Sequence, residues 1–323
     1  MIGRLLATPV VLLALSWACA AIAIDGAGPP AAAAFGVAAL AVLLAVRPFG
    51  RGLGAAFALF LGVLVWWRML EPSNDRAWLA DVARLPEATI DGDVVTIRNV
   101  RNFDYRSETD YDERWEERRY DLSKLVGTDI FLSYWGSPWI AHTIMSWAFE
   151  DGRHLAISIE TRKEQGEEYS ALLGFFRQYE LYYVVADELD LVRLRTNFRG
   201  EDVYLYRFDA PVETGRAVLL DYLRVIDELA REPRWYNALT HNCTTTIRHH
   251  VQHVGAGNPW DWRILVNGRL DELGHARGTI DASLPFEELR RISAISERGK
   301  AAPVERFSAA IREGLPGMDA RGR

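Results

Sequence analysis

The chemistry of this sequence is concentrated at Cys243, within the stretch 236–246 (YNALTHNCTTT). A loop is expected to become a helix here, with Asn242 or Thr240 as the N-cap. A thiol in the first turn of a helix faces free backbone N–H groups and the positive end of the helix dipole. Both favour the thiolate, which is the nucleophilic form of cysteine. The competing interpretation is a small residue buried at a helix start.

A cysteine nucleophile needs a base within hydrogen-bond reach and usually a third group that orients the base. His142 is the candidate base, because it is a polar residue on an otherwise apolar predicted strand. His249 and His253 are four residues apart on a predicted helix, as in some metal sites. No carboxylate or third ligand stands at a useful spacing, so we expect a solvated helix face, with neither a metal nor a cofactor.

A predicted β-hairpin supplies the candidate third group. Two apolar runs flank Asp151-Gly152, which is a hairpin signal. If residues 150–152 form a three-residue loop, Glu160 lies opposite His142 on the same face of the sheet. A carboxylate there would hold one ring nitrogen of the imidazole and leave the other for the thiol. A two-residue turn would put Thr161 opposite His142 instead, and Glu160 could also be an exposed strand charge.

The N-terminal third must hold the chain in a membrane. Its first apolar run, 5–24, is long enough to cross a hydrocarbon core of roughly 30 Å as a helix. A cleaved signal peptide is the alternative, since Arg4 precedes the run and small residues end it. Two more apolar runs, 31–46 and 53–67, follow at once. We therefore expect residues 1–70 to form a membrane anchor of three transmembrane helices.

The basic residues of the anchor predict its orientation. Arg4, Arg47 and Arg51 place the N-terminus and the second loop in the cytoplasm. Three crossings of the membrane then deliver the rest of the chain to the oxidising outside. Structural cysteines in such an oxidising compartment are usually paired. Cys243 has no partner, because the only other cysteine, Cys19, lies in the first apolar run. An unpaired thiol there favours a functional role.

Composition and pattern define the remaining part as one acidic α+β domain over residues 71–323. Residues 1–70 carry +3, from four arginines and one aspartate, and the whole chain carries −7, which leaves −10 for the rest. An acidic surface argues against nucleic acid as a partner. Periodicity predicts strands, mostly antiparallel, and helices. The strands are expected at 94–103, 115–122, 128–135, 140–149, 154–162, 182–186 and 203–208, and the helices at 76–85, 168–178, 212–229, 244–251, 265–273, 285–295 and 304–313.

The order of the reactive residues resembles a known fold. A histidine on the first strand of a hairpin, followed about a hundred residues later by Asn242-Cys243 at a helix start, resembles the circularly permuted papain-like fold. That group includes lecithin retinol acyltransferase and permuted NlpC-type proteins. Some members carry a second histidine twelve residues after the first, as His142 and His154 do here. The resemblance therefore keeps His154 beside Glu160 as the alternative orienting residue.

Several linked motifs carry a second resemblance: SIETRKE at 158–164, YELYY at 179–183 and NCTT at 242–245. Together they look like the Lnb periplasmic-domain family over roughly residues 74–255. The family's namesake is a bacterial lipoprotein N-acyltransferase, which moves a fatty acyl chain to the N-terminal amine of a lipoprotein. The resemblance implies a bacterial inner-membrane protein whose C-terminal domain lies in the periplasm. In the namesake, membrane spans follow the domain, whereas here three apolar runs precede it, so the acceptor stays open.

The resemblance implies a thiol mechanism. Cys243 would attack an ester of a membrane lipid, His142 would take the thiol proton, and an acyl-enzyme would form. An amine, such as a lipoprotein N-terminus, or water would then receive the acyl group. Sequence reasoning leaves two alternatives: a thiol peptidase or amidase acting on cell-wall peptides, and a non-catalytic binding module. An apolar channel beside the thiol would favour lipid, and a polar groove would favour peptide.

Overall fold

The computed structural model describes residues 2–318, which divide into two compact units. The first unit contains the chain up to Ser73 together with two short later segments, Glu168–Glu180 and Trp235–Ala238. The second unit contains the remaining residues, Cys243 and His142 among them.

Three apolar helices make up most of the first unit, as the sequence predicts: α1 (Ile2–Asp25), α2 (Pro29–Ala45) and α3 (Phe49–Arg68). Two prolines open α2, at positions where a backbone N–H would have no partner inside the helix. Ala7–Asp25 and Phe49–Arg68 are long and apolar enough to cross a membrane, while α2 is shorter. The three helices pack on one another through a small apolar core.

A mixed eight-stranded sheet is the centre of the second unit and confirms the α+β prediction. Its order is β1-β2-β9-β8-β7-β6-β10, with β5 paired to β2. The β2–β9 pair is parallel, and β6, β7 and β8 pair antiparallel as a meander. The strands are β1 (Glu87–Asp91), β2 (Val94–Arg101), β5 (Trp115–Asp121), β6 (Leu125–Tyr134), β7 (Ala141–Phe149), β8 (His154–Arg162), β9 (Glu180–Ala186) and β10 (Asp202–Arg207), with β3 (Asp104–Tyr105) and β4 (Tyr111–Asp112) forming a separate hairpin.

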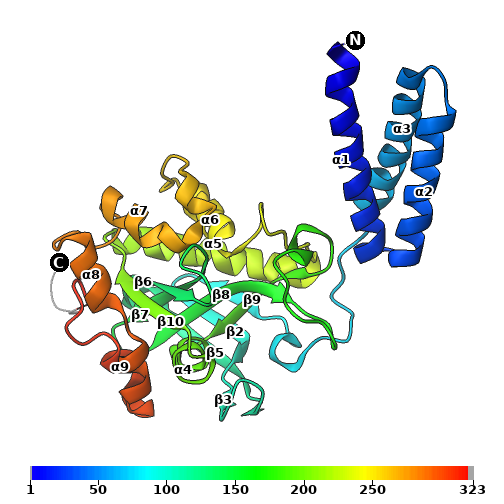
Figure 1. Cartoon of the computed structure of the whole chain (residues 1–323). Helices are drawn as coiled ribbons and strands as arrows, with labels where there is room; N and C mark the ends of the chain where they lie inside the picture. The colour runs from blue at the N-terminus through cyan, green and yellow to red at the C-terminus, as the bar shows by residue number, and fades with distance from the viewer. Residues whose placement is uncertain (1, 319–323) are drawn as a thin grey trace. The chain divides into compact units, whose positions relative to one another are not determined.

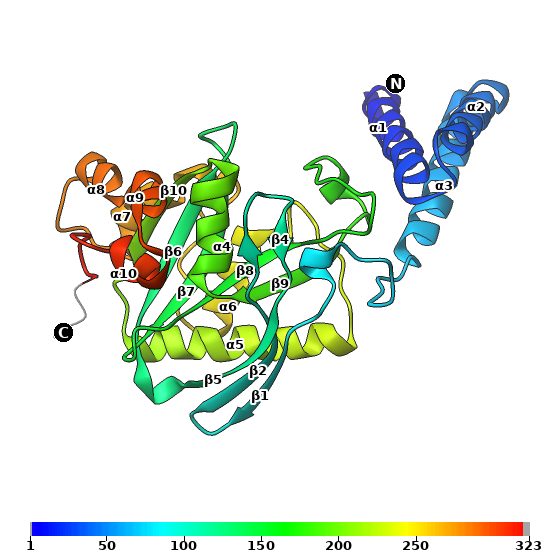
Figure 2. The ribbon, with the colours of Figure 1, turned by 90° about the horizontal axis from the view of Figure 1, so that it is seen from below.

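Helices cover both faces of the sheet, and alternation along β7 decides which side chain faces which helix. Trp147 faces α5 (Val212–Arg231), where its Nε1 donates to the Gly215 carbonyl at 2.9 Å. Ser146 faces α4 (Glu188–Arg193) and donates to Glu188 Oε1 at 2.6 Å. Figures 1 and 2 show α4 and α5 on opposite sides of the strands.

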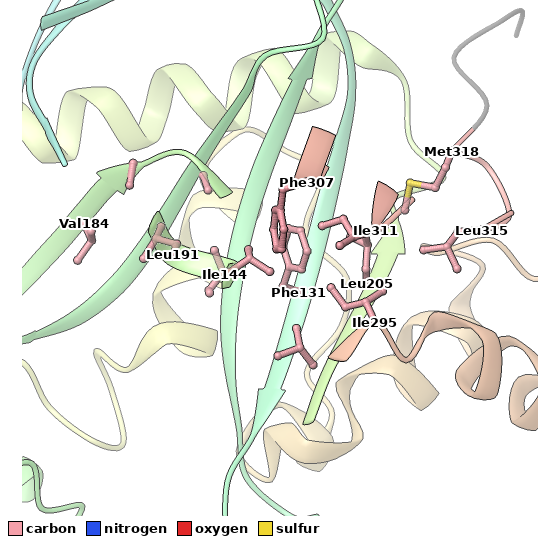
Figure 3. Packing of buried hydrophobic residues seen from close by; sticks show 14 of the residues in the cluster. Phe131, Ile144, Val184, Leu191, Leu205, Ile295, Phe307, Ile311, Leu315 and Met318 are labelled. Carbon is pink, nitrogen blue, oxygen red and sulfur yellow. The ribbon is translucent and has the colours of Figure 1, made fainter. Parts of the chain in front are cut away.

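The C-terminal region closes the sheet face on which α4 lies. Phe307 and Ile311 are fully buried against Phe131 of β6 and Leu205 of β10 (Figure 3). Fully burying a side chain of this size contributes about 1.5–3 kcal/mol. The helices that follow α5 are α6 (Cys243–His253), α7 (Leu270–Arg277), α8 (Phe286–Ser293), α9 (Ser296–Ala301) and α10 (Phe307–Ala310), of which α6 packs against α5 on the other face of the sheet.

A buried ion cluster fastens the same region to the sheet. Arg312 donates to both oxygens of Glu188, at 2.5 and 2.7 Å, and to Asp129 of β6 at 2.8 Å. Both carboxylate side chains are fully buried. Burial opposes ionisation of Glu188, but the charge and hydrogen bonds of Arg312 outweigh it and lower the pKa of that carboxyl to about 2.

Two predicted helices are wrong. Within 76–85 only Ala80–Val82 is helical, because Leu79 instead donates its N–H to the Lys163 carbonyl just beyond β8. Within 168–178 only the short turn Leu173–Phe175 is helical, and the Gly174 carbonyl accepts the N–H of Ala238. In both segments, contacts with distant parts of the chain override the local periodicity.

Arg312→Ala tests the buried cluster. Removing the guanidinium leaves the buried Glu188 without its arginine and Asp129 with Arg207 as its remaining arginine partner, which costs about 3–5 kcal/mol of folding free energy near neutral pH. The loss should be smaller near pH 4, because the carboxyls of the variant can then take up protons, whereas Glu188 in the native protein stays ionised down to about pH 2. Thermal unfolding of the full chain in detergent, followed by tryptophan fluorescence, measures both effects.

The matched control is Arg306→Ala, because Arg306 pairs with Glu313 at the surface of the same region. An exposed pair contributes about 0–1 kcal/mol. Equal losses of stability in the two variants would contradict a special role for the Arg312 cluster.

Candidate active site

The start of α6 is fixed by a reciprocal capping interaction. Asn242 Oδ1 accepts the Thr245 N–H at 2.9 Å, and Thr245 Oγ1 accepts the Asn242 N–H at 3.0 Å. This capping box satisfies two backbone donors and makes Cys243 the first residue of the helix. The prediction of Asn242 as the N-cap is confirmed. Cys243 is 8% exposed, so its thiol is buried but close to the surface.

The turn between β7 and β8 has three residues, as expected from the hairpin prediction. Ala148 pairs with His154 and Ile144 pairs with Ser158, so paired residue numbers sum to 302. Gly152 adopts the left-handed conformation, with φ of 82°, that such a loop requires at its last position. The two-residue alternative is therefore excluded.

This register gathers three polar side chains on one face of the sheet. His142 Nε2 lies 2.6 Å from Ser158 Oγ and 3.6 Å from Glu160 Oε1. Ser158 Oγ donates to Glu160 Oε1 at 2.7 Å. Because the single hydroxyl hydrogen of Ser158 is used in that bond, Ser158 must accept from His142. The proton of the neutral imidazole then sits on Nε2, and Nδ1 is left as the basic nitrogen.

Glu160 is held as a carboxylate. Arg195, which follows α4, donates from Nη2 to Glu160 Oε1 at 2.9 Å, and its own side chain is almost completely buried. Burial alone would raise the pKa of Glu160, but hydrogen bonding to His142 and the charge of Arg195 hold it well below its usual value. The orienting group therefore carries a permanent negative charge behind the imidazole.

Cys243 and His142 form a coupled acid–base pair. Burial opposes ionisation of the Cys243 thiol. The hydrogen bond and the charge of His142 outweigh this effect and lower the pKa of Cys243 to about 7, and the Thr143 N–H and the Thr244 hydroxyl contribute in the same direction. For His142, burial is outweighed by hydrogen bonding to Cys243 and Glu160, which raises its pKa to about 9. Between these values the pair is a thiolate and an imidazolium, the state of an activated cysteine nucleophile.

Asn267 joins the two halves of the site. Its side-chain amide accepts the Ala141 N–H at 2.9 Å and donates to the Ala141 carbonyl at 2.6 Å, as a neighbouring strand would. The same amide nitrogen donates to Thr244 Oγ1 at 2.8 Å and lies 3.9 Å from the Cys243 sulfur. One buried side chain therefore positions both the residue before His142 and the residue after the thiol.

The other predicted histidines are placed elsewhere. His154 lies opposite Ala148, about 20 Å along β7 from His142 at roughly 3.3 Å per residue, and its Nδ1 contacts the Gly152 carbonyl. The structure therefore brings Glu160, and not His154, to the imidazole.

The predicted pair on α6, His249 and His253, has separate contacts: the His249 ring stacks on His241 with centroids 6.3 Å apart. His253 Nδ1 lies 2.7 Å from Asp221 Oδ1, and the other oxygen of Asp221 lies 2.7 Å from Nδ1 of the buried His250. These contacts tie α6 to α5. Among residues 2–318, no group of three or more histidine, cysteine or acidic side chains has the arrangement of a metal site.

Three residues of the site escaped the sequence reasoning: Ser158, Arg195 and Asn267. Ser158 carried a usable signal, because it shares a strand face with Glu160 two residues away. Arg195 and Asn267 reach the site through long-range packing, and nothing in their local sequence marks them.

The pH dependence of thiol alkylation tests the ion pair. In a Cys19→Ala background, the rate at which iodoacetamide modifies Cys243 should rise with a midpoint near pH 7. His142→Gln should move the midpoint upward by more than one unit, because only the Thr143 N–H and the Thr244 hydroxyl then compensate the burial that opposes ionisation. Glu160→Gln should cause a smaller upward shift. Mass spectrometry of the peptide that contains Cys243 gives the rates.

His154→Gln is the matched control and should leave the midpoint unchanged, since that ring lies at the far end of the hairpin. An upward shift in His154→Gln with none in Glu160→Gln would reverse the assignment of the orienting residue.

A comparison with protein families gives a match over the part of the chain that holds these residues. No curated protein and no solved structure was found to match the chain. A protein-family model does match, and the matched region contains His142, Ser158, Glu160, Cys243 and Asn267. Residues 111–268 match the Lnb N-terminal periplasmic domain.

Proposed function

We propose that this protein is a membrane-anchored thiol acyltransferase or lipid hydrolase that forms an acyl-enzyme on Cys243. The observation that carries the proposal is the buried Cys243–His142 pair, backed by Ser158 and Glu160. A structural cysteine needs neither a basic partner nor an orienting carboxylate, and would have a raised pKa on burial. Here the pKa is lowered instead.

The proposed reaction begins with the thiolate. The Cys243 sulfur attacks the carbonyl carbon of an ester, and a tetrahedral oxyanion forms. The Thr245 N–H in the first turn of α6 is used by the Asn242 side chain, so the backbone N–H groups of Cys243 and Thr244 are the natural donors to that oxyanion. The carbon–oxygen bond of the ester then breaks, and the imidazolium of His142 gives its proton to the departing alkoxide. The products of this half are a thioester on Cys243 and a free alcohol.

The second half regenerates the thiolate. An amine or a water molecule attacks the thioester carbonyl, and the now neutral His142 takes a proton from the attacking group. The carbon–sulfur bond breaks, releasing an amide or a carboxylic acid, and the Cys243 thiolate and the His142 imidazolium return. Throughout, Glu160 and Ser158 keep the ring oriented and stabilise its charge.

An apolar cavity beside the thiol supports a fatty acyl chain as the transferred group. A cavity of about 140 Å³ lies between β6, β10, α6 and α7, and Thr244 is part of its wall. Cys243 itself does not line the cavity, but its neighbour Thr244 does, and Thr244 Oγ1 is 3.9 Å from the Cys243 sulfur. Its wall is mostly aliphatic and aromatic, including Ile247, Leu270 and Leu273. This lining favours an alkyl chain over a peptide.

The membrane helices support the same substrate class. Two apolar helices long enough to cross a bilayer, together with the periplasmic-domain family match, indicate a membrane-anchored protein. An anchored enzyme meets lipid esters at high local concentration. We therefore propose a membrane phospholipid as acyl donor, and an amine, such as a lipoprotein N-terminus, or water as acceptor.

Detection of the acyl-enzyme tests the proposal. Incubation of the full chain with phospholipid vesicles should give a fatty acyl adduct on Cys243, visible by mass spectrometry of the intact protein and of its peptides. Cys19→Ala should keep the adduct, and Cys243→Ser should abolish both adduct and turnover. Unchanged turnover in Cys243→Ser would refute the proposal. Faster acylation of Cys243 by peptide thioesters than by phospholipid would favour the peptidase alternative.

A homologous series of alkyl methanethiosulfonates tests the cavity. Each methylene that enters an apolar site contributes about 0.8 kcal/mol, or nearly fourfold in rate at full burial. In a Cys19→Ala background, the rate of modification of Cys243 should rise from the methyl to the hexyl reagent, and Leu273→Trp, which fills the cavity, should flatten the rise. Val304→Trp, at an exposed position, is the control. If the rate in the native protein does not depend on the length of the alkyl chain while the methyl reagent still reacts normally, the cavity does not bind the acyl chain. The proposal that Cys243 is the nucleophile would stand.

A further inference from the structure

The segment 168–180 belongs to the compact unit of the three apolar helices, although it comes about a hundred residues after them in the sequence. Its backbone reaches the end of α1, where the Arg177 N–H donates to Asp25 Oδ2 at 3.2 Å. The same oxygen accepts from Trp67 Nε1 of α3 at 2.6 Å. The segment is therefore fixed to the point at which both candidate spans end.

The side chain of Arg177 strengthens that attachment. Its guanidinium stacks 4.5 Å from the Trp67 ring and donates to the Arg68 carbonyl at 3.3 Å and to the Leu70 carbonyl. Carbonyls at the C-terminal end of a helix have no partner inside the helix, and a cation there also meets the negative end of the helix dipole. Arg177 thus caps α3.

The neighbouring Phe176 contacts the apolar body of α1. Its ring stacks on Trp17 with centroids 6.4 Å apart. Trp17 precedes Asp25 by eight residues, which is about 12 Å along a helix axis. Part of the segment therefore lies beside the hydrophobic length of a candidate span, and not only at its end.

The opposite side of the segment exposes large apolar side chains. Leu172 is 66% exposed, Tyr169 is 47% exposed and Phe175 is 40% exposed, whereas Phe176 and Tyr179 are buried. Separation of apolar residues into a packed side and an open side is typical of an element that lies in a membrane interface. Exposed apolar clusters on soluble surfaces are rare and mark interaction sites.

Internal hydrogen bonds hold this exposed side in place. Tyr179 Oη donates to the Glu168 carbonyl at 2.6 Å and accepts the Ser170 N–H at 3.1 Å. The Gly174 carbonyl accepts the Ala238 N–H at 2.7 Å, and a side chain at Gly174 would press on the Tyr236 ring. Leu172 and Phe175 are therefore presented by an ordered loop.

We propose that residues 168–180 form an interfacial membrane element that inserts Leu172 and Phe175 into the lipid at the bilayer face where α1 and α3 end. Lipid is the occupant because Phe176 of the same segment stacks on Trp17, within the hydrophobic length of α1, and because both candidate spans end where the segment is attached. Trp67 and Tyr169 supply the amphipathic rings that favour the headgroup level, and Arg177 supplies a cation. This inference is independent of the chemistry at Cys243.

Site-directed fluorescence in lipid nanodiscs tests the element. The full chain with Cys19→Ala and Cys243→Ala receives a single cysteine through Leu172→Cys or Phe175→Cys, and each is labelled with an environment-sensitive dye. The labels should emit at shorter wavelength than in water, and phospholipids with a nitroxide near the headgroup should quench them severalfold more than phospholipids with a nitroxide deep in the chain. Val304→Cys, exposed in the second unit, should show the emission of water and little quenching by either lipid.

Two outcomes would overturn the inference. Water-like emission at 172 and 175, equal to that at 304, would mean that the segment stays in solvent. Short-wavelength emission without quenching by any lipid nitroxide would mean that protein, and not lipid, covers the exposed side. Because Cys243 is absent from the labelled protein, neither outcome bears on the proposed acyl transfer.

Discussion

Cross-strand pairing between β7 and β8 decides where the reactive groups of this protein lie. Side chains alternate between the two faces of a strand, so a slip of one residue would turn His142 away from Ser158 and Glu160. The left-handed Gly152 sets the loop at three residues, and the loop sets the register. Everything chemical at the site, from the tautomer of the imidazole to the charge of the thiol, depends on that pairing.

Short helix α4 links the site to the C-terminal region through two buried charge systems. At its start, Glu188 meets Arg312, and just beyond its end Arg195 donates to the Leu191 carbonyl and to Glu160. Each system places charges out of water and compensates them within hydrogen-bonding distance. The orientation of the imidazole is therefore supported by residues that contact neither the thiol nor the cavity, and packing in the C-terminal region helps to keep α4 in place.

Much of the site could be predicted because its signals are local. A histidine on an apolar strand, a turn with Asp151-Gly152 and a cysteine after Asn242 each follow from short-range rules, and the hairpin count gave the partner of His142. Arg195 and Asn267 could not be found in this way, since only tertiary packing brings them to the strand ends.

The same distinction explains the errors in the fold prediction. The strands, the long helix α5 and the three apolar helices follow from periodicity over many residues. The segments 76–85 and 168–178 have helical spacing, but their backbone groups pair with Lys163 and Ala238. Where distant partners satisfy the backbone, local propensity is a weak guide.

Asn267 has a consequence for the order in which the protein matures. A ribosome makes the membrane helices first, then His142, then Cys243, and Asn267 last of these. Before the chain folds, the Cys243 thiol has an ordinary pKa of about 8.5 and little thiolate at neutral pH. Folding brings Asn267 against Ala141 and Thr244, buries the Cys243 side chain and lowers its pKa to about 7. The thiolate is therefore favoured only in the folded chain, where the side chain is already buried.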